Sequence, residues 1–249
     1  DAIFFDAYGV LKDSRGLVDG IDKTFNWLAK TGTEYLVITN DASRSPELLA
    51  DGFHSRGLHA IEADRIVSSG MLAKEFLDMK VSDGMVAYMG TLNSAHYIDD
   101  SGLHTIPVAD LNDENTERVT ALVMLDDEGF NWFEDLNKVV NLLRRRAIPA
   151  IVANPDRVYP VTKNEVSIAI GSLAAMVEHI VGKKFIRFGK PDSQIFMFAL
   201  EKLLAIRQVH RKKILMVGDT LTTDILGGNK FGLDTMLVLT GNTLAHEAE

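Results

Sequence analysis

The sequence predicts an α/β protein with a doubly wound parallel sheet and a second α/β unit inserted into it. Three short apolar runs end in polar residues, at Asp6, at Thr39-Asn40 and at Asp219. Such continuous hydrophobicity is typical of strands that are buried on both faces of a parallel sheet. Segments with helical periodicity separate the runs, and this alternation of strand and helix is the pattern of a doubly wound fold.

The outer parts of the chain supply the elements of the first unit. We expect its strands at residues 2–5, 35–38 and 214–217, and its helices at 21–30 and 194–204. In the first helix, Ile21, Phe25 and Leu28 recur at the spacing that places them on one face. Short loops join these elements, which favours a Rossmann-like sheet that binds its ligands at the carboxyl ends of the strands.

The middle of the chain starts a second α/β unit. We expect its strands at residues 85–89, 121–125 and 149–153, and a helix at 133–146. Gly84 and Gly182 mark plausible hinges on either side of it. The predicted division therefore assigns residues 1–80 and 185–249 to a core, and residues 81–184 to an insert that lies over the strand ends.

Composition and charge exclude several classes of protein. The 249 residues include 26 Lys and Arg against 35 Asp and Glu, a net charge of −9, which argues against nucleic acids and anionic membranes as partners. The chain has no cysteine, so disulfides, thiolate nucleophiles and zinc–thiolate sites are excluded. No apolar run approaches the roughly 20 residues of a membrane span and we detect no signal peptide, so we expect a cytoplasmic protein.

Polar residues from distant parts of the chain are expected to meet at one edge of the sheet. They are Asp6, Thr39, Asn40, Lys190, Asp219 and Asp224. Neighbouring carboxylates repel each other unless a cation lies between them, and a set of oxygen ligands without His or Cys favours Mg²⁺. The lysine adds positive charge, and the threonine and asparagine add hydrogen-bond donors. This combination suits a phosphoryl group, whose transfer depends on positioning and electrostatic stabilisation.

Four segments, in order, resemble the motifs of the haloacid dehalogenase superfamily. They are FFDAYGVL at 4–11, VITN at 37–40, GKP at 189–191 and GDTLTTDI at 218–225. The chain further resembles the class IIA branch, the NagD-like and p-nitrophenyl phosphatase-like enzymes, which carry a large cap of the C2 type between the second and third motifs. The markers of this branch are NPD at 154–156, YP at 159–160, GSL at 171–173 and LVLTG at 237–241.

The resemblance implies a Mg²⁺-dependent phosphohydrolase that acts on a small phosphorylated metabolite, with a sugar phosphate favoured. Asp6 would be the nucleophile and would become an aspartyl phosphate. Thr39 and Asn40 would hold the phosphoryl oxygens, and Lys190 would neutralise the charge on the nucleophile and the phosphate. We therefore expect a hydrolase with Asp6 and Lys190 as its catalytic residues.

The resemblance also implies a set of metal ligands. Asp6, Asp219 and the backbone carbonyl of Tyr8 would bind Mg²⁺, and Asp224 would be a further ligand or a partner of the ligands. The substitution at Tyr8 leaves this set intact, because that position contributes a backbone oxygen.

Tyr8 departs from the pattern of the superfamily's phosphatases, which usually carry a second aspartate there to protonate the leaving group. A tyrosine has an ordinary pKa near 10, and loss of a general acid costs roughly 10² to 10⁴ in rate. Two alternatives therefore stay open: a weak or inactive relative that binds a phosphorylated ligand, and a carbon–halogen hydrolase. The second fits the Asp-x-Tyr motif, but Asp219 and the position of the insert argue against it. Tyr8 packing against the insert is an equally open interpretation.

Other residues are candidates for contacts with the substrate. Asp41 is a possible substitute for the missing acid and base, and Arg44 lies in the loop that follows the second motif. Segments near Asp126 and at 154–156 are candidates for determining the substrate, although we favour a solvated acidic loop for residues 126–128. A homodimer through the insert, with Trp132 or Phe133 in the contact, is a further expectation.

Overall fold

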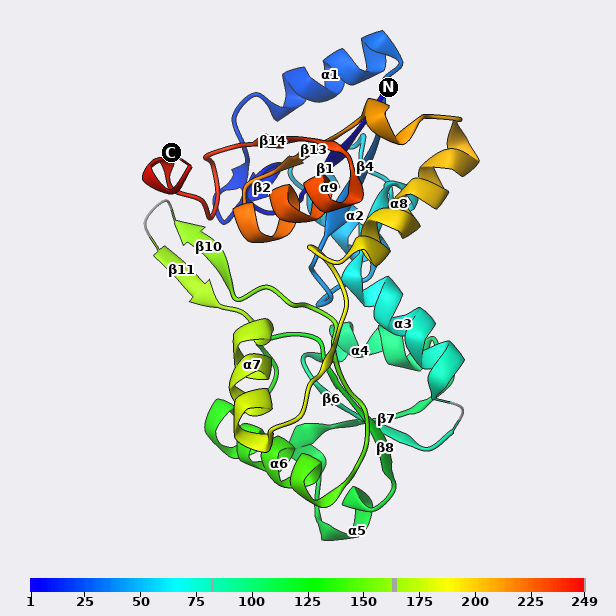
Figure 1. Ribbon diagram of the computed structural model, residues 1–249, viewed down its shortest axis with the longest axis vertical. Coiled ribbons are helices and arrows are strands. Elements are labelled where there is room, and N and C mark those ends of the chain that lie inside the picture. The colour runs from blue at the N-terminus through cyan, green and yellow to red at the C-terminus, as the bar shows by residue number, and fades with distance from the viewer. Residues whose placement is uncertain (82, 163–164, 249) are drawn as a thin grey trace.

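The computed structural model describes residues 1–81, 83–162 and 165–248, which form two lobes (Figure 1). The lobe that contains the N-terminus is built on a five-stranded parallel sheet in the order β14-β13-β1-β4-β5. Its strands are β1 (Ala2–Phe5), β4 (Glu34–Thr39), β5 (Ile66–Ser68), β13 (Ile214–Gly218) and β14 (Asp234–Leu237). Both ends of the chain thus contribute to the core sheet, as predicted.

Helices cover both faces of the core sheet. They are α1 (Ile21–Thr31), α2 (Pro46–His54), α3 (Ser69–Lys80), α8 (Ser193–Ile206) and α9 (Leu226–Phe231). Phe5 and Val37 pack with α1 and α2, whereas Phe4 and Leu36 pack with α3, α8 and α9. Successive side chains of a strand point to opposite faces, so both faces must be apolar. This arrangement explains the unbroken hydrophobic runs in the sequence.

The insert contains the second parallel sheet, in the order β12-β9-β8-β6-β7. Its strands are β6 (Met85–Met89), β7 (His104–Pro107), β8 (Val119–Met124), β9 (Ala150–Val152) and β12 (Ile186–Arg187), and its helices are α4 (Leu92–Asp99), α5 (Asp113–Thr116), α6 (Trp132–Arg145) and α7 (Ile170–Val181). One face of this sheet packs with α6 and α7 in a hydrophobic cluster of its own.

The other face of the insert sheet joins the hydrophobic core of the first lobe. Val86 and Val123 of the insert belong to the same buried cluster as Phe4 and Leu36 of the core sheet. Helix α3 lies between the two lobes, and Leu72 and Leu77 on it are part of this cluster. The insert is therefore packed on the core and not merely tethered to it.

Two hairpins meet between the lobes. The first pairs β2 (Lys12–Asp13) with β3 (Gly16–Leu17), just after the first motif, and the second pairs β10 (Val158–Thr162) with β11 (Glu165–Ile168). The Ser14 hydroxyl donates a hydrogen bond to the Val161 carbonyl. Figure 1 shows the β10–β11 hairpin reaching from the insert towards the core lobe. This hairpin closes one side of the site described below.

The predicted fold class, an α/β core sheet with an inserted α/β unit, is confirmed. The division at residues 80/81 and 184/185 stays a prediction, and β12 at Ile186–Arg187 pairs with β9 of the insert sheet. Across the described ranges, we find no helix that is both long and apolar enough to cross a membrane.

Candidate active site

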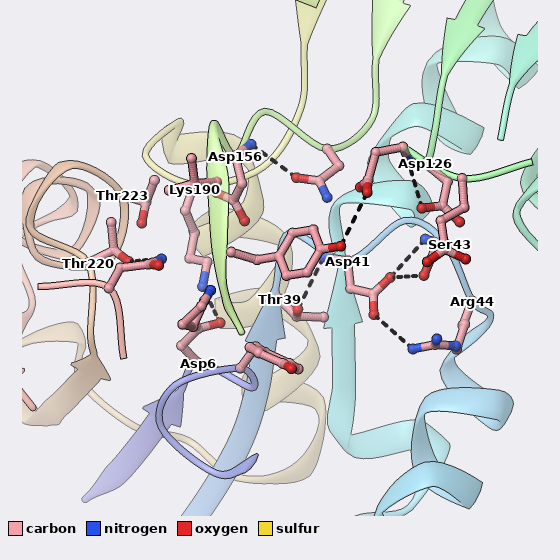
Figure 2. Close-up of a pocket in the computed structure, with 18 residues that line it drawn as sticks. Asp6, Thr39, Asp41, Ser43, Arg44, Asp126, Asp156, Lys190, Thr220 and Thr223 are labelled. Atoms are coloured by element: carbon pink, nitrogen blue, oxygen red, sulfur yellow. Dashed lines mark hydrogen bonds and ion pairs between the residues drawn. The ribbon is translucent and has the colours of Figure 1, made fainter. Parts of the chain in front are cut away.

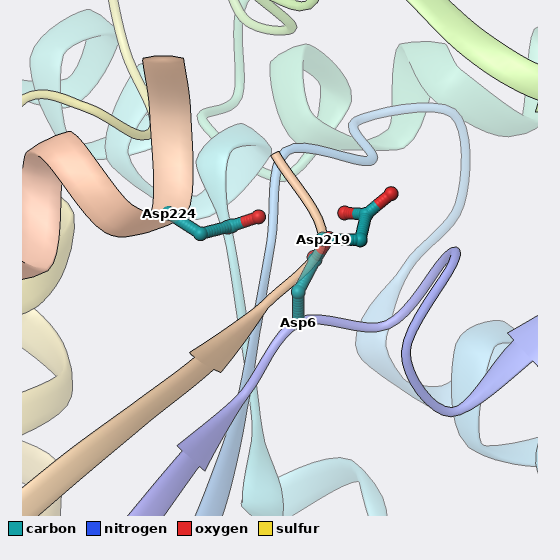
Figure 3. A group of neighbouring side chains, drawn as sticks. All are labelled: Asp6, Asp219 and Asp224. Carbon is teal, nitrogen blue, oxygen red and sulfur yellow. The ribbon is translucent and has the colours of Figure 1, made fainter. Parts of the chain in front are cut away.

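The carboxyl ends of β1, β4 and β13 bring the predicted polar residues together. Asp6 follows β1, Thr39 ends β4 and Asp219 follows β13. Phe5 lies beside Val217 on one side and Val37 on the other, so the three strand ends are level. Asp6, Asp219 and Asp224 surround one point, with a ligand atom of each within 4.8 Å of the others (Figure 3).

Lys190 is the cation at the centre of the site. Its side chain is 2% exposed, and Nζ lies 2.6 Å from Asp6 Oδ1 and 2.7 Å from Asp224 Oδ1. Nζ also donates a hydrogen bond to the Ile38 carbonyl at 3.0 Å. Burial opposes a charge here, but the carboxylates of Asp224 and Asp6 outweigh it and raise the pKa of Lys190. The lysine therefore stays protonated between its two partners.

Asp219 and Asp224 are enclosed by close backbone contacts. An added Cβ at Gly9 or Gly241 would lie 2.3 or 1.8 Å from Asp219 Oδ2, so the backbone must lack side chains there. Asp219 accepts hydrogen bonds from the Asn242 amide at 2.6 Å and from the Thr220 hydroxyl at 3.2 Å. Burial, then the nearby Asp224, raises the pKa of Asp219 to about 6. A bound cation would relieve this unfavourable concentration of negative charge.

The donor set fits a hard divalent cation. Three carboxylates lie around a point where Lys190 supplies one positive charge, which leaves net negative charge in a buried place. Asp224 is fully buried, and its oxygens face Lys190 Nζ and the Thr220 amide, the latter at 3.1 Å. Oxygen donors of this kind favour Mg²⁺ or Ca²⁺. The backbone carbonyl of Tyr8 stays a prediction as a ligand.

Asn40 uses its side chain to hold the lysine loop. Its Oδ1 accepts a hydrogen bond from the Lys190 amide at 2.7 Å, and its Nδ2 donates to the Lys190 carbonyl at 3.0 Å and to Asp156 Oδ1 at 2.8 Å. The Ser69 hydroxyl donates to the Asn40 carbonyl at 2.9 Å. Both polar atoms of the Asn40 side-chain amide therefore have protein partners. The direct contact of Asn40 with a phosphoryl oxygen stays a prediction.

The loop after β4 carries the other predicted substrate residues. Thr39 is buried, and its hydroxyl oxygen accepts a hydrogen bond from the Asp41 amide at 3.1 Å, which leaves the hydroxyl proton for another acceptor. Asp41 Oδ1 accepts bonds from the amide and hydroxyl of Ser43 at 2.8 and 2.6 Å. Arg44 lies 3.8 Å from Asp41 Oδ2. Thr39, Asp41 and Arg44 all line the cavity beside Asp6.

Tyr8 lies against the insert. Its ring meets that of Tyr159 edge to face, with the ring centres 6.4 Å apart and the planes at 82°. The Tyr159 hydroxyl lies 3.4 Å from Asp127 Oδ2. Burial, followed by the charge of Asp13, raises the pKa of Tyr8 above its ordinary value of 10.0. The phenol is therefore protonated at neutral pH and cannot serve there as a base.

A cavity of about 250 Å³ extends from Asp6 and Lys190 to the acidic loop of the insert. Figure 2 shows Asp156 beside Lys190 at one end, and Asp126 near Ser43 and Arg44 at the other. Burial, then the neighbouring Asp127 and Asp41, raises the pKa of Asp126 to about 6. The residues at 126–128 thus line the cavity, whereas the sequence favours a solvated acidic loop there.

Comparisons with known proteins agree with these motifs. Residues 3–104 match a model described as haloacid dehalogenase-like hydrolase, and residues 187–249 match one described as HAD-hydrolase-like. The chain is 30% identical to rat chronophin over 99% of its own length and 79% of that protein. The chain belongs to the haloacid dehalogenase superfamily.

Solved structures of this superfamily share the architecture throughout. A possible sugar phosphatase of the haloacid dehalogenase superfamily from Cytophaga hutchinsonii is 61% identical, with a TM-score of 0.94 over 99% of this chain and 87% of that one. A glycerol phosphate phosphatase from Mycobacterium tuberculosis, solved with magnesium, is 26% identical, with a TM-score of 0.80 over all of this chain and 71% of that one. The class IIA resemblance is consistent with both.

Several residues that line the cavity of this haloacid dehalogenase superfamily protein have no role predicted from the sequence. They are Ser43, Tyr159, Thr220, Thr223 and Asn242. Thr220 and Asn242 follow the carboxyl ends of β13 and β14, so their place in the chain is a usable signal. Tyr159 comes from the insert hairpin, and its approach to Tyr8 depends on how the two lobes pack. That packing has no signature in the local sequence.

Proposed function

We propose that this protein is a divalent-metal-dependent phosphohydrolase, with Mg²⁺ as its metal, that acts on a small phosphorylated metabolite. The observation that carries the proposal is the position of Lys190 Nζ between Asp6 and Asp224, next to Asp219. This arrangement presents a carboxylate nucleophile beside a buried cation and a cluster of metal-binding oxygens. It is the chemistry that a transferring phosphoryl group requires.

The residues present support a two-step reaction. One oxygen of Asp6 attacks phosphorus, the bond to the leaving oxygen breaks, and an aspartyl phosphate forms. Water then attacks phosphorus, releases inorganic phosphate and restores Asp6. Lys190 and the Thr39 hydroxyl hold the phosphoryl oxygens. A Mg²⁺ held by Asp6, Asp219 and Asp224 would further stabilise the negative charge on those phosphoryl oxygens. The donor of the proton to the leaving oxygen stays open, with Asp41 as one candidate.

The outer half of the cavity supports a polyhydroxylated leaving group, such as that of a sugar phosphate. Asp41, Asp126 and Asp127 line it and accept hydrogen bonds from hydroxyl groups. Arg44 also lines the outer half of the cavity, and its positive charge is already paired with Asp41. The rings of Tyr8 and Tyr159 form an apolar wall against which carbon–hydrogen faces of a small ring can pack. A carboxylated leaving group would meet repulsion there.

The test of the proposal is phosphate release from p-nitrophenyl phosphate and from a panel of sugar phosphates with Mg²⁺. We expect chelation with EDTA to lower the rate by about 10²-fold or more, because metal charge stabilisation is worth several kcal/mol, and added Mg²⁺ to restore it. Phosphate release that survives exhaustive chelation would contradict the metal assignment. A protein that binds phosphate esters without releasing phosphate would support the binding-only alternative.

The carboxylates in the outer half of the cavity predict that the protein discriminates between two substrates that differ in charge. Glycerol 3-phosphate and 3-phosphoglycerate differ by a hydroxymethyl group and a carboxylate. We expect kcat/KM for 3-phosphoglycerate to be lower by about tenfold or more, which corresponds to roughly 1.4 kcal/mol of repulsion. The double variant Asp126→Asn, Asp127→Asn should narrow the gap. Equal use of the two substrates by the parent protein would contradict this account of the cavity.

A further inference from the structure

Asp156 is a carboxylate of the insert that contacts the machinery of the core. It lies in the loop between β9 and β10, and its backbone amide donates a hydrogen bond to Asn154 Oδ1 at 3.0 Å, which shapes this loop. Its Oδ1 accepts a hydrogen bond from Asn40 Nδ2 at 2.8 Å. The side chain also lines the cavity next to Lys190 (Figure 2). No role for Asp156 follows from the two-step reaction itself.

The contact with Asp156 reinforces the orientation in which the Asn40 amide binds the backbone of Lys190. The Lys190 amide requires an acceptor, which Asn40 Oδ1 provides at 2.7 Å. A flipped side chain would place an amide NH₂ against that N–H group and an oxygen against the Asp156 carboxylate. Both contacts would be repulsive, and buried amide groups without partners are costly. Asp156 therefore adds a third contact that holds Asn40 in the orientation that binds the lysine loop.

The lysine loop in turn depends on Asn40. Both the amide and the carbonyl of Lys190 bond to the side chain of Asn40, a residue that is 2% exposed. Gly189 permits this approach, because an added Cβ would lie 2.4 Å from Asn40 Oδ1 and its φ is +110°. With the backbone held in this way, the Lys190 side chain extends to Asp6 and Asp224. The chain of contacts runs from the insert to the proposed nucleophile.

We propose that Asp156 is a positioning residue: through Asn40, it couples the seating of the insert loop on the core to the placement of Lys190. Lys190 is then correctly placed only when residues 154–156 are seated against the core. The expected effect on kcat rests on the proposed phosphohydrolase function, whereas the expected effect on the placement of Lys190 does not.

The experiment compares Asp156→Ala with Asp156→Asn in the full chain. Asparagine keeps a side-chain oxygen that accepts the bond from Asn40, and alanine does not. With p-nitrophenyl phosphate and Mg²⁺, we expect Asp156→Ala to lower kcat by about tenfold or more with KM changed by less than about threefold, since the loss falls on the chemical step. Asp156→Asn should recover most of kcat. Hydrogen exchange at the Lys190 amide should be faster in Asp156→Ala alone.

The matched control is Asp135→Ala, another buried carboxylate of the insert. Asp135 is 2% exposed, accepts a hydrogen bond from the Asn131 amide at 2.8 Å and pairs with Lys138 at 3.2 Å, all within or next to α6. It lies outside the set of residues that line the cavity. We expect this variant to lower Tm while kcat and exchange at the Lys190 amide stay unchanged. If Asp156→Ala does not fold, Asp156→Ser replaces it, since serine is too short to reach Asn40.

Three results would overturn the coupling. They are a kcat for Asp156→Ala within twofold of the parent, a loss carried by KM, and an Asp156→Asn variant no better than Asp156→Ala. A parent protein that releases no phosphate contradicts the proposed function instead. Exchange at the Lys190 amide then decides the coupling, because it requires no turnover: faster exchange in Asp156→Ala supports the coupling and unchanged exchange refutes it.

Discussion

Phosphate release by the Asp6→Asn variant is expected to fall by at least about 10³-fold, because an amide cannot replace a carboxylate as the nucleophile. Asparagine has nearly the same shape as aspartate, so the variant keeps the packing at the end of β1. Lys190 retains Asp224 as its partner at 2.7 Å, and the site stays assembled. The measurement is the initial rate of phosphate release from p-nitrophenyl phosphate with saturating Mg²⁺.

A control separates loss of the nucleophile from loss of the fold. Asp22→Asn changes an exposed carboxylate in the first turn of α1, away from the cavity, and should leave the rate unchanged. Asp6→Asn should unfold at a temperature close to that of the parent. More than a few per cent of residual activity in a correctly folded Asp6→Asn variant would remove Asp6 as the nucleophile.

The second large effect is a gain. We expect Tyr8→Asp to raise kcat on a sugar phosphate by about 10² to 10⁴-fold, which is the usual contribution of a general acid. The raised pKa of Tyr8 keeps its phenol protonated, and the ring is packed edge to face on Tyr159. An aspartate on the same backbone would supply a carboxyl group next to the leaving oxygen. The gain should be much smaller on p-nitrophenyl phosphate, whose leaving group needs little protonation.

Two companion variants locate the proton donor of the parent protein. Loss of activity in Tyr8→Phe would assign proton transfer to the phenol and contradict the account above. Full activity in Asp41→Asn would remove Asp41 as the substitute acid, whose carboxylate bonds to Ser43 and faces Arg44. A parent that is silent on all substrates, together with an active Tyr8→Asp variant, would favour the binding-only alternative.

Much of the fold could be predicted because parallel strands buried on both faces leave an unbroken apolar signal. The runs at 2–5 and 85–89 coincide with β1 and β6, and the helix expected at 133–146 is α6 at Trp132–Arg145. The gathering of Asp6, Lys190 and Asp219 followed from the same logic, since parallel strands end at one edge of a sheet. Edge strands such as β12 are too short for such a signal.

The residues of the insert that line the outer half of the cavity could not be predicted in the same way. Asp126 and Tyr159 reach the site only because the insert packs on the core through α3 and the shared apolar cluster. The role of Asn40 depends on which acceptor or donor its amide meets, and those partners lie 116 and 150 residues away in the sequence. Trp132 and Phe133 are 40% and 80% exposed, so their part in a homodimer stays a prediction.

The pairing of β1 with both β4 and β13 has a consequence for how the protein is made. Ala2 lies beside Glu34 on one side and Ile214 on the other, so the central strand of the core sheet gains its second neighbour only when residues 214–218 have been synthesised. The insert sheet is complete once Arg187 is synthesised. Because domains fold as units while the chain emerges from the ribosome, we expect the insert sheet to form before the core sheet is complete. Asp6, the proposed nucleophile, can therefore meet Asp219 only after residues 214–219 have been synthesised, and a chain that stops before them lacks part of the site.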